Sequence, residues 1–207
     1  MAGQNGLLFS KVPRHRSAVY LRIEQSSQLK QEFFIIFQCP LDGEQFTLAV
    51  GSVKIPEHFT FGKAAISTGA GTVKIDTLSS QRLSLDLGAG EVDIGTLTAT
   101  DRASINGGAG ELRIDGGELA DLDLKIGVGE ADLESRLTGN CSIDYGVGEL
   151  NLTLTGTPDD YCITLDKGVG EATLGGTKMS DDVVYGDGET SIEINGGVGA
   201  MKIEFAA

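Results

Sequence analysis

The strongest constraint on the fold of this chain is a Gly-x-Gly motif that recurs with an almost fixed period. The first glycines of the seven motifs are Gly69, Gly88, Gly108, Gly127, Gly146, Gly168 and Gly197, and the successive spacings are 19, 20, 19, 19, 22 and 29. A repeat of about 20 residues is typical of a solenoid, in which each unit stacks on its neighbour. A dinucleotide site needs a single glycine-rich turn before a helix, so the seven repeats argue against a phosphate cradle.

Apolar residues alternate on both sides of each glycine pair, and their parity changes across it. Around Gly127, Leu122 and Leu124 lie five and three residues before the glycine, whereas Ala131 and Leu133 lie four and six residues after it. Period-two alternation is typical of a strand with one buried face. Because a straight strand cannot change its inward face, the motif must be a bend where glycine permits positive φ or close backbone approach.

Each unit is therefore predicted to contain a strand, a corner, a second strand and a shorter third side. The apolar residues of the third side are Leu78, Leu97, Leu119 and Leu137. We predict an all-β, single-domain parallel β-solenoid (β-helix) of about seven rungs of 19–22 residues, right-handed as most crossovers between parallel strands are. Stacking in chain order predicts two core columns: Ile105, Leu124, Ile143 and Leu165, and Ile114, Leu133, Leu152 and Leu174.

The repeat domain is assigned to residues 61–207, and residues 1–60 are predicted to be an irregular N-terminal cap or non-repeat segment. Strand-like stretches in this segment cover residues 18–24, 32–37 and 46–56. A cap would cover the strand edges that the end of a solenoid exposes. Residues 175–190 replace a normal third side with a longer loop.

Charge and cysteine content restrict the partners. Residues 1–60 carry six Lys/Arg and five Asp/Glu, a net charge of +1. Residues 61–207 carry ten Lys/Arg and twenty-five Asp/Glu, a net charge of −15, which gives the total of −14. This acidity disfavours nucleic acid and anionic membrane surfaces, which need clustered basic residues. Three cysteines without a CxxC pair indicate no disulfide framework. The longest apolar run, residues 33–37, is too short for a signal peptide or a membrane span, so we expect no direct membrane insertion.

The most regular polar feature is the glutamate that follows Gly-x-Gly. It occupies five consecutive units, between Thr72 and Ala200 at the ends: Glu91, Glu111, Glu130, Glu149 and Glu171. Neighbouring rungs lie about 4.8 Å apart, so the carboxylates should form a column whose mutual repulsion raises their pKa values. A cation such as Ca²⁺ would relieve the repulsion. We favour a structural role, in which each glutamate accepts corner N–H groups or faces water.

Catalytic residues are scarce. The histidines, His15 and His58, lie outside the repeats, and no nucleophile elbow or His/Cys metal cluster occurs. Outward aspartates recur as in polysaccharide-cleaving solenoids, but we interpret them as a solvated face: Asp86, Asp93, Asp132, Asp144 and Asp166. Cys141 is predicted to be buried and Cys162 to point outward. We expect no enzyme activity and no cofactor.

The phrases "GAGEVDI", "GAGELRI", "GVGEADL", "GVGELNL" and "GVGEATL", with "KIPEHFTFGKAAISTGAG" before them and "INGGVGAMKIEF" after them, resemble a bacterial family of unknown function. This family carries an adhesin-like label by analogy and is common in Firmicutes. The resemblance covers residues 50–207. It implies a β-solenoid, exported or membrane-tethered, in some members linked to envelope stress, with no catalytic residues to transfer. The first fifty residues depart from it, since they show neither an anchor nor an export signal.

Three functions follow from these features. The leading one is a non-enzymatic, adhesin-like solenoid at the bacterial cell surface or outside the cell, which binds or displays a glycan or protein ligand. The second is a self-assembling β-helix scaffold similar to bactofilins, with weak self-association through the open solenoid ends. The third is a polysaccharide-active enzyme, disfavoured by the scarcity of aromatic and basic residues.

Overall fold

The computed structural model describes residues 44–48, 51–53 and 60–206, with side chains from residue 60 onward. Its elements are β1 (Glu44–Leu48), β2 (Gly51–Val53), β3 (Thr60–Ile114), β4 (Gly117–Ala120), β5 (Leu122–Thr138), β6 (Asn140–Thr155), η1 (Pro158–Asp160), β7 (Tyr161–Asp166), β8 (Val169–Leu174), β9 (Thr177–Lys178), β10 (Val183–Tyr185) and β11 (Thr190–Ala206). This part of the chain contains no α-helix and only one short 3₁₀ turn, η1. The predicted all-β class is confirmed.

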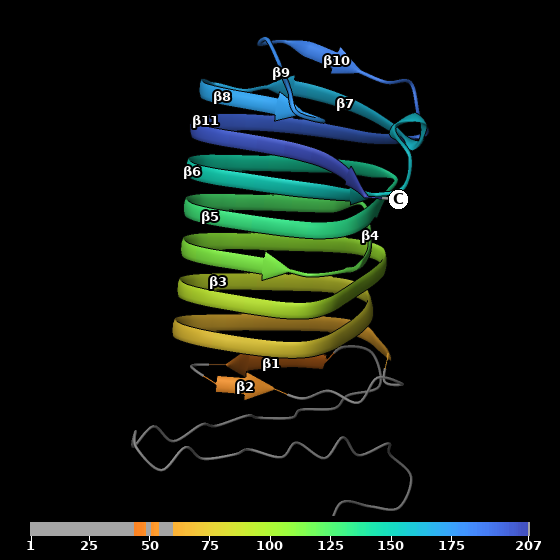
Figure 1. The fold of residues 1–207 in the computed structure, drawn as a ribbon. Coiled ribbons are helices and arrows are strands. Elements are labelled where there is room, and N and C mark those ends of the chain that lie inside the picture. The colour runs from red at the N-terminus through yellow and green to blue at the C-terminus, as the bar shows by residue number, and fades with distance from the viewer. Residues whose placement is uncertain (1–43, 49–50, 54–59, 207) are drawn as a thin grey trace, which may run out of the picture.

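The strands pair in parallel along a continuous coil. Ala103 of β3 pairs with Leu122 of β5, and Leu124 of β5 pairs with Ile143 of β6, so each residue pairs with its equivalent in the next unit. Figure 1 shows these coils stacked directly on one another. The backbone of each inner coil therefore forms hydrogen bonds with the coils on both sides of it. The predicted parallel pairing is confirmed.

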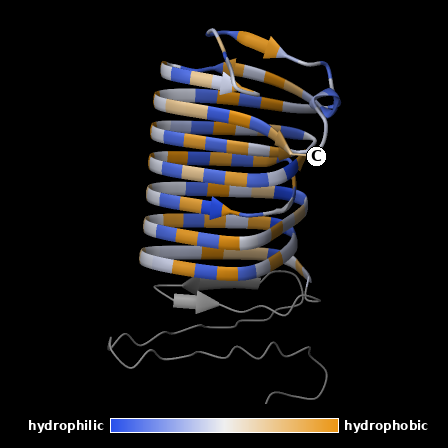
Figure 2. Ribbon diagram, in the orientation of Figure 1, coloured by the Kyte–Doolittle hydropathy of each residue, from blue (hydrophilic) through white to orange (hydrophobic). Residues whose placement is uncertain are grey.

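The buried positions follow the predicted parity change. Leu122 and Leu124 are buried before the corner, and Ala131 and Leu133 are buried after it. The third side is also buried, with Leu78, Leu97, Leu119 and Leu137 each no more than 1% exposed. Figure 2 shows the resulting alternation of apolar and polar residues along the strands. The core is thus a stack of aliphatic layers inside the coil.

Parallel pairing begins before the first Gly-x-Gly unit. Glu44 of β1 pairs with Ala64, and Gly51 of β2 pairs with Val73, both in β3. β1 and β2 overlap the strand-like stretch predicted at residues 46–56, and β1 begins two residues before it. Both strands lie in the segment 1–60, which was assigned outside the repeat domain. The other two strand-like stretches, at 18–24 and 32–37, lie outside the described residues.

The C-terminal strand is not at the end of the stack. β11 lies between β6 on one side and β7 with β8 on the other, and it pairs in parallel with all three. Ile194 pairs with both Ile143 and Leu165, and Ile203 pairs with both Leu152 and Leu174. The two core columns predicted from chain order are therefore wrong at their last step, because a residue of β11 separates the final two members.

Side-chain charges on the stacked strands favour this order. If β7 and β8 followed β6 directly, Asp166 would face Asp144 and Glu171 would face Glu149. In the structure, Asn195 and Ala200 of β11 take the places between them. Asn195 Nδ2 donates a hydrogen bond to Asp144 Oδ1 at 2.9 Å. Since like charges directly opposite each other destabilise a sheet, the insertion removes two repulsions and adds a hydrogen bond.

Two irregular connections make the insertion geometrically feasible. Between β6 and β7 the chain passes η1, where the Thr157 N–H donates to Asp160 Oδ2 at 2.8 Å and the Tyr161 hydroxyl donates to the Thr155 carbonyl at 2.6 Å. This connection belongs to the first unit whose spacing is longer than the regular repeat. The extra length lets the chain skip one layer, and the still longer spacing before the last unit allows β11 to fill it.

The loop before β11 also closes the C-terminal end of the stack. β9 pairs antiparallel with β8, and β10 pairs antiparallel with β7. Figure 1 shows β10 lying across the end of the molecule beyond β7. Because an unpaired strand edge invites edge-to-edge association, these short antiparallel strands protect the outermost parallel coil.

Candidate functional site: the carboxylate column at the corners

The corner backbone explains why each unit needs two glycines. Gly129, the second glycine of its motif, has φ of +140°, and a Cβ atom on it would overlap the carbonyl oxygen of Gly110 in the preceding coil. A Cβ atom on Gly127 would lie 2.5 Å from the Gly108 carbonyl oxygen. The first glycine is therefore required by close approach, and the second by close approach and positive φ together.

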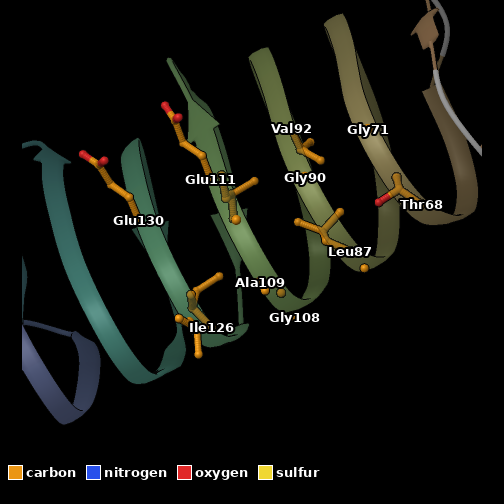
Figure 3. Close-up of a pocket in the computed structure, with 15 residues that line it drawn as sticks. Thr68, Gly71, Leu87, Gly90, Val92, Gly108, Ala109, Glu111, Ile126 and Glu130 are labelled. Carbon is orange, nitrogen blue, oxygen red and sulfur yellow. The ribbon is translucent and has the colours of Figure 1, made fainter.

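The glutamates after these glycines stand beside one another on successive coils. Glu111 pairs with Glu130, and Glu130 pairs with Glu149. At the N-terminal end of the row, Thr72 Oγ1 donates to Glu91 Oε2 at 3.4 Å. Figure 3 shows Glu111 and Glu130 extending in the same direction from adjacent coils, away from Leu87 and Ile126. We call Glu91, Glu111, Glu130 and Glu149 the carboxylate column.

Glu171 does not continue this column directly. Ala200 of β11 pairs with Glu149 on one side and with Glu171 on the other, so one layer without a carboxylate separates them. Glu171 instead accepts a hydrogen bond from Lys178 Nζ at 2.6 Å. The sequence predicted one column of five glutamates. In the structure, four of them are adjacent, and the fifth, Glu171, is separated from them and paired with a lysine.

An open groove of about 660 Å³ runs along the carboxylate column. It is lined by the second glycines and the residues that follow them: Gly71, Thr72, Gly90, Glu91, Gly110, Glu111, Gly129, Glu130, Gly148 and Glu149. The glycines leave the groove floor without side chains, so the backbone of five successive coils is accessible along the column. A second hollow, which shares Glu111 and Glu130 with the groove, measures only about 20 Å³, which admits about one water molecule.

The members of the column differ in how their charge is balanced. Arg113 donates to Glu111 at 3.4 Å, whereas Glu130 and Glu149 make no hydrogen bond or ion pair with any described residue. The nearby Asp132 carboxylate, partial desolvation, and the charges of Glu111 and Glu149 raise the pKa of Glu130 above its ordinary value. By contrast, the hydrogen bond and charge of Lys178 lower the pKa of Glu171. Neither Glu130 nor Glu149 accepts a hydrogen bond from a corner N–H group of the described residues. Of the two structural roles predicted, bonding to corner N–H groups or facing water, these two glutamates therefore have the second.

In the part of the chain that the structure describes, no group of three His, Cys, Asp or Glu side chains is arranged so that it could hold a metal ion. The outward aspartates that recur in the sequence each have a polar partner. Asn106 donates to Asp86, Lys74 to Asp93, Arg113 to Asp132, Asn195 to Asp144, and the Gly168 N–H to Asp166. The bonds of Asp86, Asp93, Asp132 and Asp144 form ladders between neighbouring coils, whereas the bond of Asp166 lies within its own corner. Sequence reasoning missed these ladders, although the alternation of acidic with basic or amide residues at one offset was a signal for them.

Cys141 and Cys162 are both free, and burial raises the pKa of the Cys141 thiol. Cys141 is buried and Cys162 is partly exposed, as predicted. The histidines His15 and His58 lie outside the described residues.

A second corner feature was not recognised in the sequence. The middle residues of the last four motifs are exposed valines, with Val128 54%, Val147 50%, Val198 51% and Val169 69% exposed. They are stacked in that order by the strand register. We call these four residues the valine ridge. The change from alanine in the first three motifs to valine in the last four was the sequence signal for it.

The described residues contain no helix that is long and apolar enough to cross a membrane. No curated protein matches the sequence. A similar solved structure is that of "a putative cell adhesion protein from Clostridium sporogenes ATCC 15579", with 17% sequence identity, a TM-score of 0.31, and coverage of 90% of this chain and 76% of that chain. The sequence profile of the Toastrack DUF4097 family matches residues 20–197. This match spans most of the chain and includes all the corner motifs but the last two residues of the final one, and the chain therefore belongs to the Toastrack DUF4097 family.

Proposed function

We propose that this protein is a non-enzymatic, adhesin-like β-solenoid of the bacterial cell surface, which binds an extended cationic ligand along the corner groove. In this proposal the coil is right-handed and has about seven rungs. The observation that carries it is the carboxylate column, in which Glu130 and Glu149 stand in an open groove without a neutralising partner among the described residues.

The geometry of the groove defines the kind of ligand that fits. The column repeats once per coil, at about 4.8 Å, so a polymer with regularly spaced positive charges would satisfy several carboxylates at once. In two of these coils, Val128 and Val147 of the valine ridge lie two residues before Glu130 and Glu149 and offer apolar contact in the same coils. A basic protein segment and an amino-sugar glycan both have this chemistry, and the net charge of −14 would attract either.

The test is a titration of the full chain with a lysine-rich peptide and with a glucosamine oligomer, using a neutral glucose oligomer as the reference ligand. We expect binding of one cationic probe with a strong decrease at high salt, because exposed charges are screened. The triple variant Glu111→Gln/Glu130→Gln/Glu149→Gln should lose this binding. The matched control Glu118→Gln/Glu134→Gln/Glu193→Gln changes the net charge equally at exposed positions outside the groove, and should retain it.

Equal losses in the two triple variants would show that binding depends only on overall charge, and would overturn the groove proposal. The cell-surface location is tested by protease treatment of intact cells, where a surface protein is digested without lysis.

Two alternatives stay open. A self-assembling scaffold would polymerise through its solenoid ends, and sizing chromatography of the full chain distinguishes it by a mass that grows with concentration. The antiparallel strands β9 and β10 cover one of those ends, which disfavours simple end-to-end stacking. A polysaccharide-active enzyme would release shortened products from an acidic glycan, and a product assay distinguishes it from a binding protein.

A further inference from the structure

The most unusual feature of the molecule is that β11 fills a layer between strands that precede it in the chain. β6 pairs with one edge of β11, and β7 and β8 pair with its other edge. Among the described strands, β7 to β10 pair with the remaining sheet only through β11. If β11 is removed, β6 and β7–β8 are left as two unpaired parallel edges that face each other across one empty layer. We call this layer the β11 slot.

The slot is selective for the sequence of β11. Its inward positions take Ile192, Ile194, Met201 and Ile203, all at most 2% exposed. Its corner requires glycine, because a Cβ atom on Gly197 or Gly199 would overlap the carbonyl oxygens of Gly146 or Gly148. Its polar positions favour an amide beside Asp144 and an uncharged residue between Glu149 and Glu171, which Asn195 and Ala200 provide. None of the other six units has both an amide residue at the first of these positions and an uncharged residue at the second.

We propose that the β11 slot is a strand-binding site that accepts β11 from a second copy of the chain, so that two copies join by exchanging this strand. The occupant is the same segment in both cases, and all its contacts with the slot are therefore preserved. β11 is tethered to β10 only by residues 186–189, which include Gly186 and Gly188. Both walls of the slot are synthesised before β11, so their edges stay unpaired until a β11 strand arrives, from the same chain or from another. This inference does not depend on the proposed ligand.

Engineered disulfides in the full chain test the exchange. Ser142 of β6 and Glu193 of β11 are register partners with outward side chains. Neighbouring strands lie about 4.8 Å apart, within the range that a disulfide spans. The variant Ser142→Cys/Glu193→Cys, with Cys39→Ser and Cys162→Ser, is refolded at several protein concentrations, oxidised, and separated under non-reducing denaturing conditions. Cys141 is retained because it is buried.

A closed monomer gives an intrachain disulfide, and an exchanged pair gives a covalent dimer. We expect the ratio of dimer to monomer to rise about tenfold for a tenfold increase in concentration, because exchange competes with an intramolecular reaction. The matched control is Ser104→Cys/Asp123→Cys in the same background, which joins register partners of two successive coils with no inserted strand. It should stay intrachain at every concentration.

A second trap identifies the exchanged segment. Ser191→Cys places a thiol beside the native Cys162, its register partner on β7. If β11 alone is exchanged, it lies beside β7 of the other copy, and the disulfide is interchain. If β7 to β11 are exchanged as one unit, β11 stays beside β7 of its own chain. The disulfide in the exchanged pair is then intrachain, and the proposal is overturned. Intrachain disulfides from the Ser142/Glu193 positions at every concentration, or equal dimer yields from that pair and the Ser104/Asp123 control, overturn it as well.

Discussion

At the scale of single residues, the corner glycines are where backbone geometry leaves the least freedom. Gly129→Ala should destabilise the protein by about 1–3 kcal/mol, because alanine would keep a positive φ and meet the Gly110 carbonyl. Gly127→Ala should be harmful to a lesser degree, since only the close approach to Gly108 applies. Urea denaturation measures both. Gly62→Ala is the control, as a Cβ there meets nothing within 4 Å. Equal losses at Gly62 and Gly129 would contradict this explanation of the motif.

Two glutamates at the same offset should respond to neutralisation in opposite ways. The folded-state pKa of Glu130 is raised, so its charged form is disfavoured by folding and stability falls as pH rises through that pKa. The pKa of Glu171 is lowered by Lys178, so its contribution is present above the unfolded pKa and is lost as pH falls through the folded value. Glu130→Gln should therefore raise the melting temperature at pH 7, and Glu171→Gln should lower it.

Both differences should shrink when the pH falls below about 4, where carboxyl groups in the unfolded chain are protonated. Thermal melts of the two variants and the wild type from pH 3 to pH 8 measure this. A decrease in melting temperature for Glu130→Gln at pH 7 would show that its carboxylate has a stabilising partner after all.

At the scale of elements, each strand is selected for its layer by the polar residues it presents to its neighbours. Lys74 pairs with Asp93 at 2.9 Å, and Asp132 receives hydrogen bonds from both Arg113 at 3.1 Å and Asn151 at 2.7 Å. Individually such exposed pairs contribute little. Repeated along the stack, they distinguish a correct neighbour from an incorrect one whose apolar pattern is the same.

Ala200→Glu tests this matching in β11. The substitution restores the glutamate that five other units carry, and places it between Glu149 and Glu171. We expect a loss of about 0.2–1 kcal/mol relative to Ala200→Gln, the uncharged variant of similar size, because like charges opposite each other repel. Urea denaturation at low and high salt measures the difference, which should decrease at high salt. A salt-independent loss in both variants would indicate steric crowding at the corner instead.

At the scale of the whole molecule, β11 is the strand through which the C-terminal layers hold together. Ile194→Ala should increase hydrogen exchange on both sides of it, in β6 and in β7 to β10, because its side chain is stacked between Ile143 and Leu165. Leu165→Ala should increase exchange only in β7 to β10. Both remove a buried side chain, at about 2–5 kcal/mol each. Leu85→Ala, in β3, is the control that should leave all these strands protected.

An equal increase of hydrogen exchange in β6 for Ile194→Ala and Leu165→Ala would contradict this prediction. It would mean that β6 opens together with β7 to β11 as one unit, so that β11 has no special role in linking them. Exchange measured peptide by peptide in the mass spectrometer resolves the two cases.

The sequence by itself determined everything that lies within one unit. The inward residues, the parity change at the corner and the buried third side all follow from period-two alternation and from glycine geometry, which depend on residues a few positions apart. Leu124 and Ile143 were placed correctly because the spacing of the motifs is regular there, so that the next unit in the chain is also the next layer of the stack.

Only the tertiary structure decided the order of the last layers and the surroundings of each carboxylate. All units present nearly the same apolar pattern, so that pattern allows any unit to stack on any other. The choice depends on the long connections around η1 and β9–β10 and on pairs such as Asn195 with Asp144, which form only after the coils meet. Glu149 and Glu171 look equivalent in the sequence, yet Ala200 separates them and Lys178 neutralises only one, because partners in this fold are set by spatial neighbours rather than by distance along the chain.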